Sequence, residues 1–170
     1  MNPASRIPTL LALVGVALAG DAGADEHVYY TREYAVAATG MCRAATYDAG
    51  RGLRYRPIGI YNAGSAPVDI SCALRSESVD DYDIRATFYN YNADATTVTC
   101  AVLSGAREAP GQTYVRNASV SVPAGGTATL SEYAGWIANN HFASLSCRVP
   151  AGVEMGSIVA NGFCYYGCSY

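Results

Sequence analysis

Val68-Asp69-Ile70-Ser71-Cys72-Ala73-Leu74 is the stretch that decides the fold, because every second residue in it is apolar. Successive side chains of a β-strand point to opposite faces, so the apolar residues of this segment share one face. The same pattern, again with a central cysteine, recurs in Val98-Thr99-Cys100-Ala101-Val102 and in Leu145-Ser146-Cys147-Arg148-Val149. These segments predict strands that bury one face in a core and leave the other face polar.

Strand patterns of this kind cover most of the chain, and residues that favour turns separate them. The expected strands are 34–42, 53–62, 67–75, 82–92, 96–104, 114–122, 126–131, 144–149 and 157–166. A short helix is conceivable only over 131–139, where Ser131 could cap it. Short strands at this spacing predict an all-β fold: one antiparallel β-sandwich, immunoglobulin-like or jelly-roll, of about eight or nine strands.

The composition excludes several classes of protein. Of the 170 residues 51% are hydrophobic and 15% are charged, and the net charge is −3. All 11 basic residues are arginine, so lysine-based covalent catalysis is excluded. The length allows about one domain. A disordered tail and a nucleic-acid-coating polycation are both excluded by these values, and we expect no nucleic-acid partner.

The N-terminus has the pattern of a secretory signal peptide over residues 1–24. Arg6 precedes the apolar run Ile7–Ala19, and Ala22-Gly23-Ala24 supplies small residues for cleavage. The apolar run is too short to cross a bilayer as a helix, and no other stretch approaches 18 apolar residues. The mature chain should therefore have no membrane span. We therefore expect a secreted or periplasmic protein, with an N-terminal extension over 25–33 and the sandwich over 34–170.

All six cysteines follow this signal, and an even number in an exported chain indicates disulfides. The pairing that we favour is Cys42–Cys72, Cys100–Cys147 and Cys164–Cys168. An alternative links Cys42 or Cys72 to the C-terminal pair, and the sequence does not choose between them. No C-x-x-C motif is present to suggest zinc.

Residues suited to catalysis are few. A Ser-His-Asp triad needs a histidine, and only His27 and His141 exist, without a Gly-x-Ser-x-Gly motif. A glycosidase needs two facing carboxylates, and a pair such as Glu77 and Glu132 has nothing to mark it. We predict a protein that is not an enzyme, with a small secreted hydrolase as the remote alternative.

An acidic stretch, Glu77–Asp83, is the one candidate for a metal ligand set. Asp80, Asp81 and Asp83 offer the oxygen ligands that calcium prefers, although the spacing is not that of an EF-hand. The simpler interpretation is a polar loop between strands that keeps the surface soluble. We expect no cofactor, with calcium at these aspartates as the alternative.

Tyrosine is the unusual feature, with 14 of them against one Trp and three Phe. Tyr89 and Tyr91 fall opposite the core-facing residues of their strand, with Asn90 and Asn92 interleaved. A tyrosine ring offers a flat apolar face and a hydroxyl, which suits contact with sugars or proteins. The alternative is that tyrosine is simply a good strand former.

The sequence therefore favours an exported, non-catalytic domain that binds a glycan or a protein surface through Tyr89, Tyr91, Asn90 and Asn92. A second interpretation is a structural subunit of a cell-envelope or extracellular assembly. In that case sheet edges or the tail 165–170 would pair with neighbouring molecules. Neither the ligand nor the oligomeric state follows from the sequence.

Overall fold

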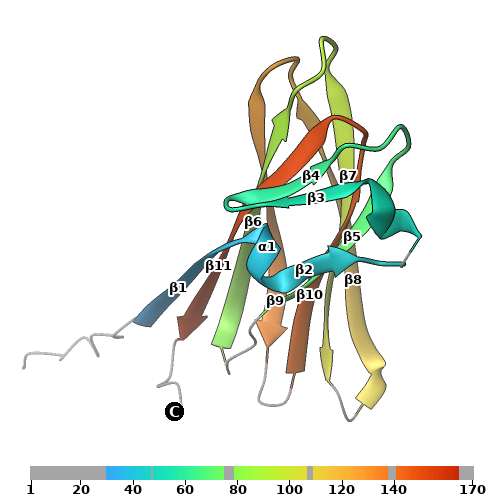
Figure 1. Ribbon diagram of the computed structural model, residues 1–170. Helices are drawn as coiled ribbons and strands as arrows, with labels where there is room; N and C mark the ends of the chain where they lie inside the picture. Colours follow the sequence, from blue (N-terminus) through green and yellow to red (C-terminus); the bar gives the residue numbers. More distant parts are fainter. Residues whose placement is uncertain (1–29, 47, 75–78, 107–108, 138–140, 165–170) are drawn as a thin grey trace, which may run out of the picture.

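Two antiparallel sheets face each other in the computed structural model of the chain (Figure 1). The structure describes residues 30–46, 48–74, 79–106, 109–137 and 141–164. We call the six-stranded sheet A and the five-stranded sheet B. Together they confirm the predicted β-sandwich, with eleven strands in the described part of the chain instead of eight or nine.

Sheet A contains β1, β3, β4, β6, β9 and β11, and β11 is the strand that joins its parts. The bounds are β1 Tyr30–Ala37, β3 Leu53–Arg56, β4 Gly59–Asn62, β6 Val79–Asn90, β9 Thr127–Ile137 and β11 Val153–Cys164. The order is β3-β4-β11-β6-β9, and β1 pairs with β11 beyond the end of β4. The short β3–β4 hairpin thus extends sheet A at one edge.

Sheet B has the order β2-β5-β10-β7-β8. Its strands are β2 Cys42–Ala44, β5 Val68–Leu74, β7 Thr96–Ala106, β8 Ala109–Val122 and β10 His141–Val149. The one-turn helix α1, Ala38–Met41, lies between β1 and β2, and the 3-10 turn η1, Ala49–Gly52, precedes β3. The three segments with a central cysteine became the neighbouring strands β5, β10 and β7.

The core forms between the sheets, from the alternate residues that the sequence pattern predicted. β5 has the strict alternation of buried and exposed residues along Val68–Leu74. The largest fully buried apolar side chains are Phe88, Ile60, Ile70, Ile84, Leu145, Met155 and Ile158. Both sheets contribute to this set, so the core is shared between the two layers.

Two disulfides join neighbouring strands within sheet B. Cys42 on β2 bonds to Cys72 on β5, and Cys100 on β7 bonds to Cys147 on β10. The bonded residues lie directly opposite each other in the strand register. The pairings that we favoured for these four cysteines are therefore present, whereas the pair Cys164–Cys168 lies outside the described side chains.

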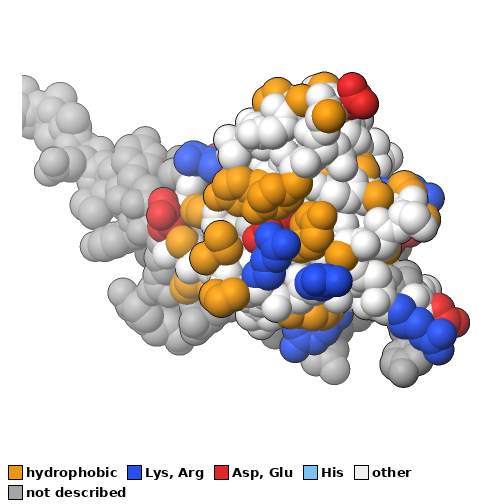
Figure 2. All heavy atoms as spheres, turned by 45° about the horizontal axis from the view of Figure 1, so that its top comes forward, with side chains coloured by type: hydrophobic (Ala, Val, Ile, Leu, Met, Phe, Trp, Pro, Cys, Tyr) orange, Lys and Arg blue, Asp and Glu red, His pale blue; other side chains and the backbone are white. Residues whose placement is uncertain are grey.

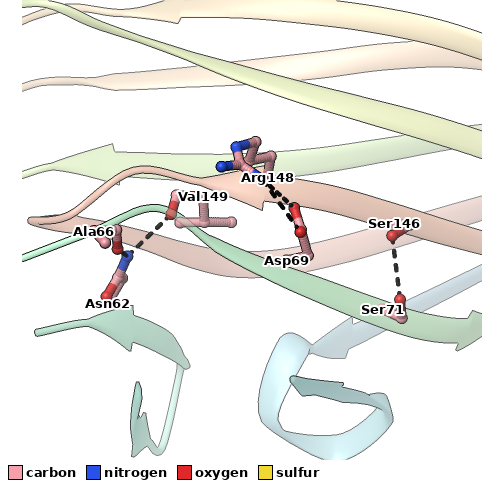
Figure 3. Close-up of polar contacts among 7 residues, drawn as sticks. All are labelled: Asn62, Ala66, Asp69, Ser71, Ser146, Arg148 and Val149. Atoms are coloured by element: carbon pink, nitrogen blue, oxygen red, sulfur yellow. Dashed lines mark hydrogen bonds and ion pairs between the residues drawn. The ribbon is translucent and has the colours of Figure 1, made fainter. Parts of the chain in front are cut away.

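Two buried asparagines connect the sheets at the ends of strands. The Asn62 amide, at the end of β4, donates to the carbonyl oxygens of Ala66 at 2.9 Å and Val149 at 3.0 Å (Figure 3). Asn90, at the end of β6, donates in the same way to Asp94 at 2.8 Å and Val122 at 3.2 Å. Each side chain fixes the turn that follows it and reaches a strand of sheet B.

Figure 3 also shows Asp69 with Arg148 and Ser71 with Ser146, on the outer face of sheet B.

Several expected boundaries were wrong. The segment 131–139, which we considered as a short helix, is strand β9 as far as Ile137. Pairing with β6 overrides its weak helical pattern. The first strand begins at Tyr30, inside the expected extension 25–33, because it pairs with β11 from Cys164 to Ser157. The acidic stretch from Val79 onward belongs to β6 and is not a loop.

Candidate functional site

A row of polar and aromatic residues crosses the outer face of sheet A. The strand register places Arg54 opposite Tyr61, Tyr61 opposite Glu154, and Glu154 opposite Tyr89. Neighbours on one sheet face lie close enough for their side chains to interact. Tyr91, directly after β6, completes the group. We call Arg56, Tyr61, Tyr89, Tyr91 and Glu154 the tyrosine face.

Glu154 is the centre of the tyrosine face and is completely buried, although it lies on the outer side of the sheet. The Arg56 guanidinium donates to its Oε2 at 2.8 Å, and the Tyr91 hydroxyl donates to the same oxygen at 3.0 Å. Its Oε1 has no hydrogen-bond partner among the described residues. A buried carboxylate is costly unless it is paired, and the contacts with Arg56 and Tyr91 offset that cost for Glu154 beneath the rings.

The aromatic rings around Glu154 have a defined arrangement. The centroids of Tyr61 and Tyr91 are 5.5 Å apart, and the ring planes are at 90°. The Arg56 guanidinium carbon lies 4.3 Å from the Tyr61 centroid and 5.5 Å from that of Tyr91, within cation–π range. Figure 2 shows hydrophobic and arginine side chains gathered together on one face, with acidic atoms almost hidden between them.

Burial and Glu154 together raise the pKa of Tyr91 above its ordinary value of 10.0. Burial contributes most, and the hydrogen bond and negative charge of Glu154 add to it, while Arg56 acts in the opposite direction. The phenol therefore stays protonated and continues to donate to Glu154 at any physiological pH.

The structure divides the four residues predicted to bind a ligand into two pairs. Tyr91 is 56% exposed, and Tyr89 is partly buried beside it on the predicted face. Asn90 is buried, and its amide is occupied by the carbonyls of the following turn and of β8. Asn92 is exposed, but its amide donates to the Ala151 carbonyl at 2.8 Å. The asparagines thus shape the turns, and the tyrosines form the surface.

The remaining candidate residues lie on separate strands or outside the described side chains. Asp83 lies on β6, while the side chains of Asp80 and Asp81 are outside the described set. No cluster of three metal-ligating side chains occurs in the described part of the chain. Glu132 lies on β9, and His141 begins β10, with its side chain outside that set as well. His27 and Glu77 lie outside the described residues.

Sequence reasoning missed Arg56, Tyr61 and Glu154. Arg56 is 98 positions from Glu154 in the chain, and Tyr91 is 63 positions from it. Tyr61 carried a usable signal, because it alternates with the buried residues Ile60 and Asn62. Glu154 carried none, since its neighbours Val153 and Met155 suggest only an ordinary strand.

Two hollows lie away from the tyrosine face. One, of about 480 Å³, lies on the outer face of sheet B. It is lined by Asp69, Thr99, Cys100, Ala101, Asn117, Ala118, Ser119, Ser146 and Arg148. None of these residues has an aromatic ring. The other, of about 420 Å³, lies beside β3 and includes Arg43, Arg51 and Tyr55 in its lining.

Comparison with known proteins identifies the fold class. No protein-family model matches the chain, and no curated protein is similar to it in sequence. Among solved structures, a xylan-binding module, CBM15, is 13% identical with a TM-score of 0.51. The match covers 78% of this chain and 97% of the module. A CBM6 carbohydrate-binding module from Cellvibrio mixtus lichenase 5A, in complex with cellotriose, is 12% identical. In that match the TM-score is 0.45, with 75% of this chain and 95% of the module covered.

At such identities the likeness concerns the fold alone: the chain has the β-sandwich architecture of the CBM15 module. The disulfides of sheet B are typical of proteins from oxidising compartments. In the described residues, no helix has the length and apolar character needed to cross a bilayer.

Proposed function

We propose that the protein is an exported, non-catalytic domain that binds a glycan through the tyrosine face. The observation that carries the proposal is the arrangement of Tyr61 and Tyr91 around the buried Glu154 and its partly exposed partner Arg56. Export is supported by the signal-like residues 1–24 and by the disulfides.

The geometry suits a sugar ring. Tyr91 presents more than half of its side chain to solvent, and its hydroxyl is anchored by Glu154. A pyranose has an apolar C–H face that packs on an aromatic ring, and hydroxyl groups that bond to polar neighbours such as Arg56. Because the ring is already held, little side-chain entropy is lost on binding.

The fold supports the same proposal. The CBM15 module, whose architecture this chain shares, is named as xylan-binding. Fold alone does not establish function, so the proposal depends mainly on the aromatic rings of the tyrosine face. Glu154 is the only carboxylate in the tyrosine face as defined, whereas glycoside hydrolysis uses a facing pair. This favours binding over hydrolysis.

A glycan microarray with the mature protein tests the proposal. We expect binding to at least one oligosaccharide class, and a loss of at least about tenfold in affinity for Tyr91→Ala, about 1.4 kcal/mol. The matched control is Tyr114→Ala, since Tyr114 is a more exposed tyrosine on sheet B, at 68%. Equal losses in both variants, or no binding to any glycan, would contradict the proposal.

The exposed edge of sheet B favours a second candidate, a structural subunit of an extracellular assembly. β8 is an edge strand, and it exposes Tyr114 at 68% and Val115 at 54%. Edge strands with exposed apolar residues pair readily with other chains. Light scattering at high concentration separates the two candidates: assembly that Val115→Arg abolishes would support the subunit, and a monomer would count against it.

A further inference from the structure

We infer that the glycan bound at the tyrosine face is acidic and carries carboxylate or sulfate groups. This inference rests on the proposed function and deepens it. Its basis is an accumulation of arginine around β3, the edge strand beside the tyrosine face.

The charge distribution along the chain is uneven. The net charge of the protein is −3, yet the segment 43–56 contains four arginines and a single acid, Asp48. The arginines are Arg43, Arg51, Arg54 and Arg56. A local excess of positive charge on an acidic protein attracts anionic ligands to that place.

On one side of β3, Arg54 and Arg56 extend the tyrosine face. They are two residues apart in the strand, so they share a face, and Arg54 lies opposite Tyr61. Arg56 is neutralised by Glu154. Arg54 is exposed and makes no hydrogen bond or ion pair with the described residues. Its guanidinium is therefore available beside the rings.

On the other side of β3 lies the hollow of about 420 Å³ that includes Arg43, Arg51 and Tyr55. Arg43 donates to the carbonyl oxygens of Cys42 at 2.8 Å and Thr39 at 3.5 Å, so no described carboxylate neutralises it. Arg51 lies 3.6 Å from Asp48, and both side chains are highly exposed. Tyr55 adds a ring that is half exposed.

β3 thus has the exposed Arg54 guanidinium beside the rings on one side, and Arg43 with the half-exposed Tyr55 ring on the other. Guanidinium donates to carboxylate and sulfate oxygens in charge-assisted hydrogen bonds, which are stronger than those to neutral hydroxyls. The hollow on sheet B differs, because its Arg148 is paired with Asp69 at 3.3 Å across neighbouring strands. A neutral glycan would gain little binding free energy from the arginines around β3. An acidic glycan would gain binding free energy from each charged sugar unit that meets an arginine.

The test is calorimetric titration of the mature protein with oligogalacturonate, its methyl ester and a sulfated oligosaccharide. The ester has the same backbone without the charge. We expect an acidic ligand to bind about tenfold more tightly than the ester, and Arg54→Gln to remove most of that difference. Raising sodium chloride from about 0.05 M to about 0.5 M should weaken only the acidic ligands, because salt screens exposed charges. Arg148→Gln is the matched control.

The outcomes separate the two proposals. Binding of the ester or of neutral xylo-oligosaccharides as tightly as the acidic ligands, with sensitivity to Tyr91→Ala, would overturn the acidic ligand and keep the glycan site. Absence of binding by every oligosaccharide would overturn the proposed function itself. A preference for acidic ligands that Arg148→Gln removes and Arg54→Gln does not would contradict the assignment to β3.

Discussion

Glu154 shows how a charged residue can be buried on the outer side of a sheet. The Tyr61 and Tyr89 side chains lie across the strands on either side, and Arg56 supplies the opposite charge. Removing one partner of a buried pair leaves an uncompensated charge. Arg56 thus has two roles, since it neutralises Glu154 and also contacts the ring of Tyr61.

Gly59 is required where the chain passes this carboxylate. A Cβ there would lie 2.5 Å from the Met155 carbonyl oxygen and 2.7 Å from Glu154 Oε1. The Met155 oxygen belongs to the backbone and cannot move freely, so we expect Gly59→Ala to lower the free energy of unfolding by about 1–3 kcal/mol. Denaturant unfolding measures this value.

Gly40→Ala is the control for that substitution, because a Cβ at Gly40 meets nothing within 4 Å. Gly40 lies in α1, where alanine is favoured over glycine. An equal loss of stability in both variants would show that the packing around Glu154 is not the cause.

Tyr91 is predicted to titrate above pH 10.0, because burial and Glu154 raise its pKa. A group with a raised pKa contributes stability that is complete below its unfolded value and is lost as the pH rises through the folded value. The Tyr91–Glu154 contact therefore supports the fold up to about pH 10 and fails above it. The ultraviolet titration difference between the wild type and Tyr91→Phe isolates this phenol. Titration below pH 10.0 would contradict the assigned contact.

Single residues of the site were predictable only where strand alternation applied. Tyr89 and Tyr91 could be placed on the outer face because they alternate with the core residue Phe88. Arg56 and Glu154 were not, because their pairing depends on which strands become neighbours across 98 positions of sequence. Asn90 appeared to belong to the surface, yet the structure uses its amide to close a turn.

At the scale of elements, the alternation of apolar and polar residues predicted β5, β7 and β10 and the buried face that carries their cysteines, whereas strand pairing sets which cysteines lie opposite each other. The helix conceived over 131–139 was wrong, since only the long pairing with β6 makes that segment a strand. The acidic part of β6 and the early start of β1 were missed because both strands depend on β11 for pairing.

The disulfides should contribute unequally to stability. Cys42–Cys72 spans 30 positions and Cys100–Cys147 spans 47. Loop-closure entropy gives about 3.7 and about 4 kcal/mol respectively. We expect Cys100→Ala with Cys147→Ala to lower the free energy of unfolding at least as much as Cys42→Ala with Cys72→Ala. Little loss in either double variant would show that strand pairing alone holds sheet B.

The register shift in β11 should affect the position of the Tyr89 ring more than the stability of the fold. The register of β11 with β6 shifts between Met155 and Ile158. A Cβ on Gly156 would lie 2.6 Å from Cε2 of Tyr89, whose side chain can move. Gly156→Ala should therefore displace the Tyr89 ring and weaken glycan binding several-fold, with a loss of unfolding free energy below that of Gly59→Ala. A stability loss as large as that of Gly59→Ala would contradict this separation.

At the scale of the whole molecule, the sequence was enough for the sandwich and for a tyrosine-bearing outer face. It could not show which of the two outer faces carries a site, because that depends on the order of strands in each sheet. Sheet A presents rings and the exposed Arg54, whereas the hollow of sheet B is lined by small polar side chains and the paired Asp69 and Arg148.

The most direct test of this assignment is the map of backbone amide chemical-shift changes as an oligosaccharide that binds is titrated into the mature protein. We expect the largest changes at Tyr61, Tyr91 and Glu154 of the tyrosine face, spreading to Arg54 on β3. Changes concentrated at Thr99, Asn117 and Arg148 on sheet B would contradict it.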